Sequence, residues 1–247
     1  MNIDKVLILS AGKGTRMGRL GEVLPKPLWP IGNATLLEFQ IKYWQSKGIK
    51  NIYINVYHQK EILKEYLQSF SDVHILEEPE LLGVGGGIHN LANLKEVNYS
   101  GDLLISNVDV LCFCENILEK LKNSMEGRDA CLNLFSTDNE SYREVCVENN
   151  KVIGIEKSNK EHFLTYSGLS LIKLDTLKKR AGKSDFFDSV CNYQEKNIGA
   201  FHSENLEYWD FGTLERYHSS IYRLLTTEET HLKQALLDLD LYTEIKV

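Results

Sequence analysis

Residues 5–16 read KVLILSAGKGTR, an apolar run that passes directly into a glycine-rich segment. The run 5–10 is short and nearly continuous, which is typical of a buried strand. Gly12 and Gly14 follow at once, and glycines mark points where regular structure gives way to a loop. We therefore expect a buried strand that ends in a glycine-rich loop at one edge of a sheet.

Strands and helices continue to alternate over the first 110 residues. Leu37, Ile41 and Trp44 recur at helical spacing, and Gly48 closes that segment. Further strands are expected at 52–57, 73–76 and 103–109, and further helices at 62–70 and from the glycine cluster 83–87 towards Leu94. Strand–helix–strand units of this kind imply right-handed crossovers and a mostly parallel sheet.

The second half is richer in strands. Strands are expected at 130–135, 145–148, 152–155 and 164–172, with Asn149-Asn150 as the hairpin turn between the second and the third. A helix is expected at 214–225, and the polar tail after Thr226 is expected to be helical through Leu236 and Leu237. The pattern predicts an α/β fold, a mostly parallel mixed sheet flanked by helices with a β-rich second half. We expect one domain at 1–225 and a helical C-terminal tail at 226–247.

Composition narrows the classes of protein to which the chain can belong. Among 247 residues, 28 Lys and Arg against 35 Asp and Glu give a net charge of −7, which argues against general nucleic-acid binding. Hydrophobic residues make up 43% and charged residues 26%, as in ordinary globular proteins. No apolar run approaches the roughly 20 residues that cross a bilayer, and the start lacks the apolar segment of a signal peptide. The five cysteines form no C-x-x-C pair, so we expect ordinary thiols, a cytoplasmic location and no membrane partner.

Two segments near the N-terminus suit phosphate binding. Glycines let the backbone N–H groups of residues 12–15 close on phosphate oxygens, and Arg16 adds a fixed fork of donors. The loop is neither a Walker A sequence nor the dinucleotide pattern G-x-G-x-x-G, because Arg19 stands where the third glycine belongs. The sequence Pro25-Lys26-Pro27 holds the chain extended around one lysine, which it would present to a phosphate. The structural alternatives are a plain turn at the glycines and a rigid surface turn at the prolines.

Several of these segments fall where strands end. In open α/β sheets, ligands bind at the carboxyl ends of the strands. The Gly12 loop, the 83–87 loop and Asp109 all follow expected strands, so we expect them on one rim of the sheet. Each of the acidic candidates also has a purely structural interpretation. Asp109 could cap a helix, and Asp210 could cap the helix that starts near Thr213. Glu156-Lys157 could be a solvated pair of charges. Glu77, Glu78 and Glu80 are expected to be exposed charges.

Six motifs in the same order resemble those of the sugar-1-phosphate nucleotidyltransferases, also called NDP-sugar pyrophosphorylases. The resemblance spans roughly residues 3–225. The motifs are Leu9–Met17 with Pro25-Lys26-Pro27, Leu82–Gly87, Asn107-Val108-Asp109, Val152–Lys157, Tyr166-Ser167-Gly168 and Trp209–Glu215. The resemblance implies a Rossmann-like nucleotide-diphospho-sugar transferase fold.

The resemblance also implies a role for each motif. Arg16 would brace the triphosphate, Lys26 would reach the α-phosphate or the incoming sugar phosphate, and Lys157 would hold the sugar phosphate. Asp109 and Asp210 would hold Mg²⁺, a hard ion that prefers oxygen ligands. The nucleotide would be bound by Ala11, Gly12, Gly14, Thr15, Gly85 and Gly86, and the sugar by Asn107, Glu156 and Gly168.

The implied reaction transfers a nucleoside monophosphate from a nucleoside triphosphate to a sugar 1-phosphate, giving an NDP-sugar and pyrophosphate. Both reactants are anions, so the protein must supply positioning and positive charge. The form of the 82–87 motif most resembles guanylyltransferases and uridylyltransferases that make precursors of envelope or capsule glycans. The chain departs from the family pattern at Val84, Val108, Ser158 and Leu214. The resemblance therefore indicates the type of reaction more firmly than it indicates the substrate. A homo-oligomer is left open.

Two other functions remain as alternatives. A CTP-dependent cytidylyltransferase acting on phosphocholine or a similar phosphate would need aromatic side chains around a quaternary ammonium. Trp29, Trp44, Tyr166 and Trp209 are available for that purpose. A catalytically silent domain that binds a sugar nucleotide would have no use for a pair of metal-binding aspartates.

Overall fold

The computed structural model describes residues 3–15 and 18–243, which form two compact units. The N-terminal unit comprises residues 4–15, 18–81, 107–113 and 207–243, and the central unit comprises residue 3 with residues 82–106 and 114–206. The chain therefore leaves the N-terminal unit and returns to it twice. Within the described residues, no helix is both long and apolar enough to cross a membrane.

Three parallel strands form the sheet of the N-terminal unit, in the order β5–β4–β1. They are β1 (Lys5–Leu9), β4 (Asn51–Val56) and β5 (Val73–Glu77), and their register pairs Ile8 with Ile54 and Ile54 with Ile75. Parallel neighbours cannot be joined by a tight turn. Helices α2 (Leu36–Ser46) and α3 (Lys60–Leu67) lie in the two connections, so the expected alternation of strands and helices is confirmed.

Helix α2 buries the face that its sequence indicates. The Thr35 hydroxyl caps the helix by accepting a hydrogen bond of 3.0 Å from a backbone N–H of the first turn. Leu37, Ile41 and Trp44 are all buried. Gly48 follows the helix with a φ of +84°, a left-handed conformation that glycine adopts without strain. The predicted helix and its glycine end are confirmed.

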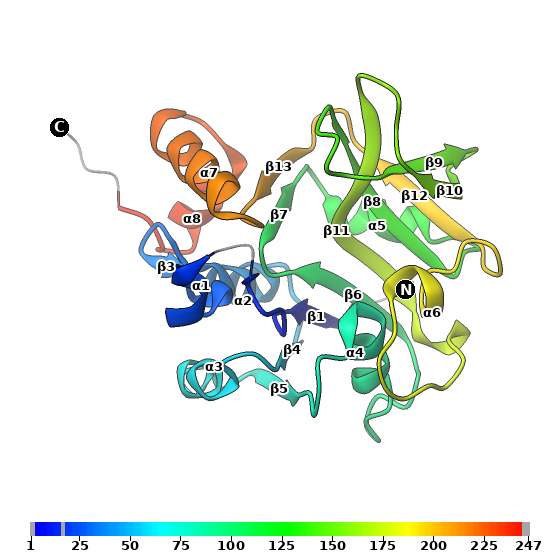
Figure 1. Cartoon of the computed structure of the whole chain (residues 1–247), viewed down its shortest axis with the longest axis horizontal. Coiled ribbons are helices and arrows are strands. Elements are labelled where there is room, and N and C mark those ends of the chain that lie inside the picture. The colour runs from blue at the N-terminus through cyan, green and yellow to red at the C-terminus, as the bar shows by residue number, and fades with distance from the viewer. Residues whose placement is uncertain (1–2, 16–17, 244–247) are drawn as a thin grey trace. The chain divides into compact units, whose positions relative to one another are not determined.

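A two-stranded antiparallel ribbon brings a late segment of the chain back to the N-terminal unit. The ribbon consists of β7 (Val110–Phe113) and β13 (Glu207–Asp210), with Trp209 opposite Leu111. Helix α7 (Leu214–Thr226) follows β13 and packs beside it (Figure 1). The other elements of the unit are α1 (Arg19–Val23), η2 (Lys26–Leu28), β2 (Pro30–Ile31), β3 (Ala34–Thr35) and α8 (His231–Asp238).

The central unit holds a mixed set of strands in the order β6–β11–β8–β12–β10–β9. β11 runs antiparallel to β6 and β8, and β12 runs parallel to β8. β9 and β10 form an antiparallel hairpin, visible at the edge of Figure 1. Its turn residues Asn149 and Asn150 have φ of +48° and +58°, so the predicted asparagine turn is confirmed. The strands are β6 (Asp102–Asn107), β8 (Ala130–Thr137), β9 (Glu144–Glu148), β10 (Lys151–Glu156), β11 (Phe163–Lys173) and β12 (Ile198–His202).

The glycine cluster of the central unit opens a helix, as expected, and the glycines themselves are helical rather than a loop ahead of it. Residues 83–87 form the first turns of α4 (Gly83–Ala92). A Cβ atom on Gly85 would lie 2.4 Å from the carbonyl oxygen of Asp185, and one on Gly86 would lie 2.7 Å from that of Gly182. The glycines therefore permit close packing of the helix on a neighbouring backbone segment. The remaining helices of the unit are α5 (Ile117–Ser124), η3 (Leu174–Thr176) and α6 (Phe186–Ser189).

Candidate active site

The glycine-rich loop of the N-terminal unit starts from a buried polar anchor. The N–H of Ser10 donates to Asn55 Oδ1 at 2.7 Å, and the Ser10 hydroxyl donates to the Asn55 carbonyl at 2.5 Å. The Asn55 amide in turn donates to Glu78 Oε1 at 2.7 Å. Glu78 is only 1% exposed, so the expectation of an exposed charge at this position is wrong. Since buried polar groups need partners, this chain of bonds fixes the point where the loop leaves β1.

The loop lines a cavity of about 350 Å³. Gly12, Gly14 and Thr15 face this cavity, whereas Ala11 is buried. Gly14 has a φ of +62°, which explains why glycine stands there. Arg16, the donor predicted to brace the triphosphate, lies outside the described residues.

Lys26 points into the same cavity from a buried position. The side chain is 9% exposed, and its Nζ donates to Asp109 Oδ2 at 2.5 Å and to the Gly212 carbonyl at 2.8 Å. Pro25 is extended and Pro27 lies within the short helix η2, so the two prolines stiffen the backbone on either side of the lysine. The alternative of a rigid surface turn is therefore wrong.

Asp210 ends β13, and Asp109 directly precedes the partner strand β7 of the ribbon. The register pairs Asp210 with Val110, and the N–H of Phe211 donates to the Asp109 carbonyl at 2.8 Å. A Cβ atom on Gly212 would lie 2.7 Å from Asp210 Oδ1 and 3.7 Å from Asp109 Oδ2, so both carboxylates flank this glycine. The pairing thus brings together two acids that are about 100 residues apart in the sequence.

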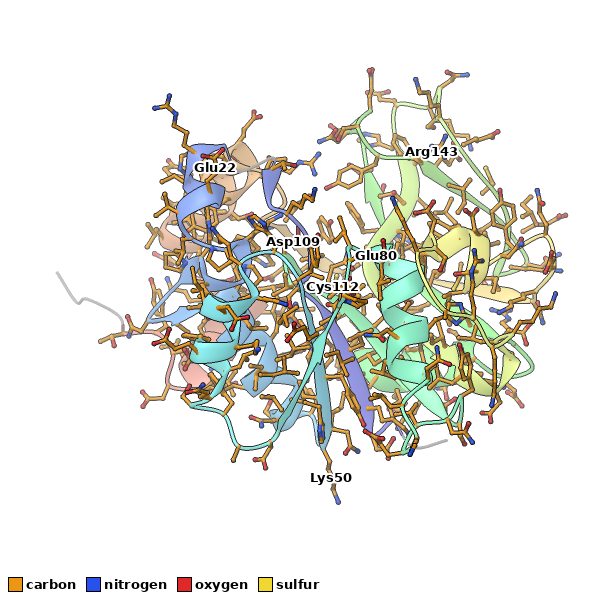
Figure 2. All side chains as sticks on the ribbon, turned by 60° about the horizontal axis from the view of Figure 1, so that its bottom comes forward. Glu22, Lys50, Glu80, Asp109, Cys112 and Arg143 are labelled. Carbon is orange, nitrogen blue, oxygen red and sulfur yellow. The ribbon has the colours of Figure 1, made fainter. Side chains whose placement is uncertain are left out.

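Figure 2 places Asp109 relative to the sheet of this unit. Lys50 directly precedes β4, and Asp109 lies at the opposite end of the strands from it. Asp109 is therefore at the carboxyl end of the parallel strands, where ligands bind in folds of this kind. The expected proximity of Asp109 and the Gly12 loop is confirmed, because both line the same cavity.

Asp210 is engaged by its own turn and by the following helix. Its Oδ1 accepts a hydrogen bond of 2.6 Å from the N–H of Gly212, and its Oδ2 accepts one of 2.8 Å from Arg216. The helix cap of α7 is instead Thr213, whose hydroxyl accepts from a first-turn N–H at 3.2 Å. The alternative that Asp210 caps this helix is therefore wrong.

The two carboxylates have the chemistry of a magnesium site. Mg²⁺ prefers oxygen ligands, and commonly binds through one or two carboxylates with waters and substrate phosphates completing its shell. Within residues 3–15 and 18–243, no group of three or more His, Cys, Asp and Glu side chains could hold a metal ion. The donor set therefore fits an ion that is shared with a phosphate better than one enclosed by protein.

Gln40 supports this site and is not among the residues singled out from the sequence. Its side-chain N–H₂ donates to the carbonyls of Asn107 and Val110, at 2.9 and 3.0 Å, on either side of Asp109. Its Oε1 accepts from the Trp44 indole at 2.7 Å. The sequence signal that could have revealed Gln40 is a polar residue at a position of α2 that the helical spacing assigns to the buried apolar face, and the structure shows that Gln40 is buried there.

Of the other predicted nucleotide and sugar residues, Asn107 belongs to the N-terminal unit and the rest belong to the central unit. Gly85 and Gly86 are buried in α4, and the N–H of Gly86 donates to the Ser184 carbonyl at 3.1 Å. Glu156 ends β10 and accepts from the Cys146 thiol at 3.4 Å, and Lys157 is exposed directly after it. Gly168 has a φ of +85° where the pairing of β11 with β8 is interrupted. The roles of these residues stay predictions.

The aromatic side chains considered for a quaternary ammonium do not gather at one place. In the N-terminal unit, Trp29 packs on Tyr217, Trp44 packs on Tyr43, and Trp209 is covered by the guanidinium of Arg223 at 4.0 Å. All three indoles are at most 5% exposed. Tyr166 belongs to the central unit, where it stacks on Phe186. This distribution does not favour the phosphocholine alternative.

Comparison with known proteins agrees with the geometry. Residues 6–194 match a family described as the MobA-like NTP transferase domain. The chain is 31% identical over 222 residues to D-glycero-alpha-D-manno-heptose 1-phosphate guanylyltransferase of Campylobacter jejuni subsp. jejuni serotype O:2, covering 87% of this chain and 97% of that protein. It is also 31% identical over 154 residues to the bifunctional protein GlmU of Methanococcus aeolicus, covering 62% of this chain and 35% of that protein. The chain thus spans only about a third of the length of this GlmU relative.

Solved structures share the fold at lower sequence identity. HddC from Yersinia pseudotuberculosis superposes with a TM-score of 0.76 at 21% identity, covering 90% of this chain and 99% of that one. A UDP-glucose pyrophosphorylase complexed with UDP-glucose gives a TM-score of 0.73 at 17% identity, covering 92% and 100%. The predicted fold class, a Rossmann-like α/β fold with a mixed sheet flanked by helices, is confirmed.

Proposed function

Since the chain belongs to the MobA-like NTP transferase family, we propose that it transfers a nucleoside monophosphate from a nucleoside triphosphate to a sugar 1-phosphate. Membership confirms the resemblance to the sugar-1-phosphate nucleotidyltransferases, which include the Campylobacter relative. The observation that carries the proposal is the cluster of Lys26, Asp109 and Asp210 beside the glycine-rich loop, all within one unit.

The reaction needs charge and positioning rather than a covalent intermediate. A phosphate oxygen of the sugar phosphate attacks the α-phosphorus of the triphosphate, the bond between the α-phosphorus and the bridging oxygen breaks, and pyrophosphate leaves. Two anions must approach each other, so cations and N–H donors have to offset their repulsion. The backbone of Gly12 and Gly14 and the ammonium of Lys26 supply such groups at one cavity.

Lys26 is positioned for this role by its two protein contacts. An ammonium has three N–H donors. One is directed to Asp109 and one to the Gly212 carbonyl, so the third can donate to a phosphate oxygen in the cavity that Lys26 lines. The lysine is thereby held at a fixed place while it keeps a donor for the substrate.

Asp109 and Asp210 are the residues that would hold Mg²⁺. The ion would supply positive charge to the phosphates of the substrate. Lys26 approaches Asp109 through Oδ2, and Arg216 approaches Asp210 through Oδ2. These two cations fix the orientation of the carboxylates and offset part of their mutual repulsion.

The substrates are assigned from the remaining motifs and from the relatives. We assign the binding of the triphosphate to Arg16 and the binding of the base to the Gly85-Gly86 end of α4. We assign the binding of the sugar phosphate to Lys157. The sugar itself would be bound by Asn107, Glu156 and Gly168. A guanylyltransferase acting on a heptose 1-phosphate is the first choice, because the relative of almost equal length carries that activity in its name. Mannose 1-phosphate is also considered, because the form of the 82–87 motif resembles that of guanylyltransferases for either sugar. A uridylyltransferase is the second. All five cysteines are free, which agrees with a cytoplasmic enzyme.

Release of pyrophosphate tests this function. GTP, UTP, CTP, ATP and dTTP would each be combined with heptose, mannose, glucose and N-acetylglucosamine 1-phosphates and with phosphocholine, in Mg²⁺. We expect release with a sugar 1-phosphate and the loss of most turnover in Asp109→Asn, while the matched surface variant Asp72→Asn stays active. Release with phosphocholine and CTP alone would favour the cytidylyltransferase. Tight nucleotide binding with no release from any pair would favour the silent domain.

A further inference from the structure

Gln40 of α2 contacts both ends of the turn that carries Asp109. The turn consists of residues 107–110, joins β6 to β7 and belongs to the N-terminal unit, as α2 does. The Gln40 nitrogen Nε2 donates to the carbonyl of Asn107 at 2.9 Å and to the carbonyl of Val110 at 3.0 Å. One buried amide thus connects the first residue of the turn to the last, from a helix that is about 70 residues away in the sequence.

The described neighbours of Gln40 agree on one orientation of its amide. An indole N–H donates and cannot accept, so the Gln40 atom that faces the Trp44 indole at 2.7 Å is the oxygen Oε1. Carbonyl oxygens accept and cannot donate, so the atom that faces the two turn carbonyls is the nitrogen, which carries two N–H groups. Gln40 is only 1% exposed, so water has little access to replace these bonds.

Backbone hydrogen bonds hold the middle of the same turn. The N–H of Val108 donates to the Leu9 carbonyl at 3.2 Å, and the carbonyl of Asp109 accepts from the N–H of Phe211 at 2.8 Å. These bonds tie the tip of the turn to the end of β1 and to the segment after β13. Because Gln40 holds the two ends of the turn, all four turn residues have a fixed main chain, and the Asp109 carboxylate projects from a defined place into the cavity.

We propose that Gln40 is a positioning residue for the Asp109 carboxylate, and that it sets how well this carboxylate holds Mg²⁺ together with a substrate phosphate. The inference rests on the proposed function and adds to it a residue that touches neither the substrate nor the ion. Groups that orient the ligands of a metal commonly contribute about 10–100-fold to metal affinity or activity. A merely structural role of Gln40 would instead lower the stability of the whole fold and leave the metal requirement unchanged.

Two variants of α2 separate these roles. Gln40→Met keeps a side chain of nearly the same length and removes the amide, so both turn carbonyls lose their donor. The matched control is Ile41→Ala, at the next position of the helix. Ile41 is fully buried, so its truncation lowers the stability of the fold while the bonds from Gln40 to the turn remain. If Gln40→Met does not fold, Gln40→Asn replaces it, because that amide is one methylene too short to keep both bonds.

Amide hydrogen exchange of the full chain tests the positioning without substrate or metal. The N–H groups of Val108 and Phe211 are bonded only while the turn is docked, so their exchange reports its local opening. In Gln40→Met we expect these two amides to exchange about tenfold faster or more relative to the amides of β4, since two hydrogen bonds are lost. In Ile41→Ala we expect the ratio between the turn amides and the β4 amides to stay as in the wild-type chain.

Pyrophosphate release at varied Mg²⁺ concentration supplies the second measurement. In Gln40→Met we expect kcat to fall about 10–100-fold and the Mg²⁺ concentration for half the maximal rate to rise about tenfold, while KM for the sugar 1-phosphate changes less than about threefold. A smaller fraction of folded protein lowers the maximal rate but does not shift the Mg²⁺ requirement. Ile41→Ala should therefore keep the Mg²⁺ requirement of the wild-type chain.

The two measurements also distinguish this proposal from the proposed function. The positioning role is overturned if the turn amides of the Gln40 variant exchange no faster, relative to β4, than those of Ile41→Ala. It is equally overturned if an active Gln40 variant keeps the wild-type Mg²⁺ requirement. A wild-type chain that releases pyrophosphate with no pair of substrates would reject the proposed function, and the exchange measurement would still decide whether Gln40 holds the turn.

Discussion

Substitution of Gly212 by alanine is expected to displace the Asp210 carboxylate while it lowers the stability of the fold only slightly. The new Cβ would lie 2.7 Å from Asp210 Oδ1, and ordinary contact begins at 3.4 Å, so the carboxylate must withdraw by about 0.7 Å. The atom that moves is the end of a side chain rather than backbone, so the fold can adjust. The 2.6 Å hydrogen bond from the Gly212 N–H to this oxygen is weakened, which costs about 1–2 kcal/mol of unfolding free energy. The contact of Asp210 with Arg216 remains available.

Activity should fall much further than stability in Gly212→Ala. A misplacement approaching 1 Å in a catalytic constellation can cost about 100-fold in rate, so we expect pyrophosphate release to drop by roughly that factor. Urea unfolding would be measured beside it, with Gly154→Ala as the matched control, because a Cβ there would meet only ordinary contacts at 3.6 Å. Full activity of a folded Gly212→Ala protein would refute the claim that the position of Asp210 matters to the reaction.

Three further changes test other parts of the structure. Gly85→Ala should destabilise the protein by about 2–3 kcal/mol in urea unfolding, because its Cβ would meet the backbone oxygen of Asp185 at 2.4 Å; an unchanged midpoint would contradict the close packing of α4. Lys26→Met should cost about 2–3 kcal/mol, because Asp109 would lose its buried partner, and it should also abolish most turnover; a stable, active variant would exclude both roles. Burial alone would raise the pKa of Glu207, but hydrogen bonds from the backbone of α8 and from an indole lower it below its usual 4.5. The stabilisation by ionised Glu207 is present above the unfolded pKa and is lost as the pH falls through the folded pKa. The loss of unfolding free energy in Glu207→Gln, measured in urea, should therefore be large at pH 7 and should shrink below about pH 4. A loss that does not change with pH would argue against this role of the Glu207 carboxylate.

The elements that depend on local signals could be predicted from the sequence. The apolar run before Gly12, the helical spacing ahead of Gly48 and the Asn149-Asn150 turn each encode a local conformation, and each is confirmed. The candidate site could be named only through its motifs, because its contacts are not local. Lys26 and Asp109 are 83 residues apart, and no spacing rule indicates that they touch.

Two features depend on segments that are distant in the sequence. The glycines at 83–87 are predicted to open a helix, and they do, but the sequence does not show why they are glycines: the backbone at 182–185 approaches the helix too closely for a side chain. Glu78 locally indicates an exposed charge, but Asn55 from a neighbouring strand gives its carboxylate a buried partner. In each case a segment that is distant in the sequence determines the environment of the residue. A prediction from a short stretch of sequence does not include that segment.

The geometry around Asp109 is set mainly by the main chain. The N–H of Val108 donates to the Leu9 carbonyl at 3.2 Å, and the Asp109 carbonyl accepts from Phe211 at 2.8 Å. Asp109 is therefore tied on one side to the strand that carries the glycine loop and on the other to the segment that carries Asp210. Because these bonds use backbone atoms, they persist when side chains change, as Val108 does in departing from the family pattern. Positions that hold the phosphates and the metal can thus be preserved while neighbouring side chains vary with the substrate.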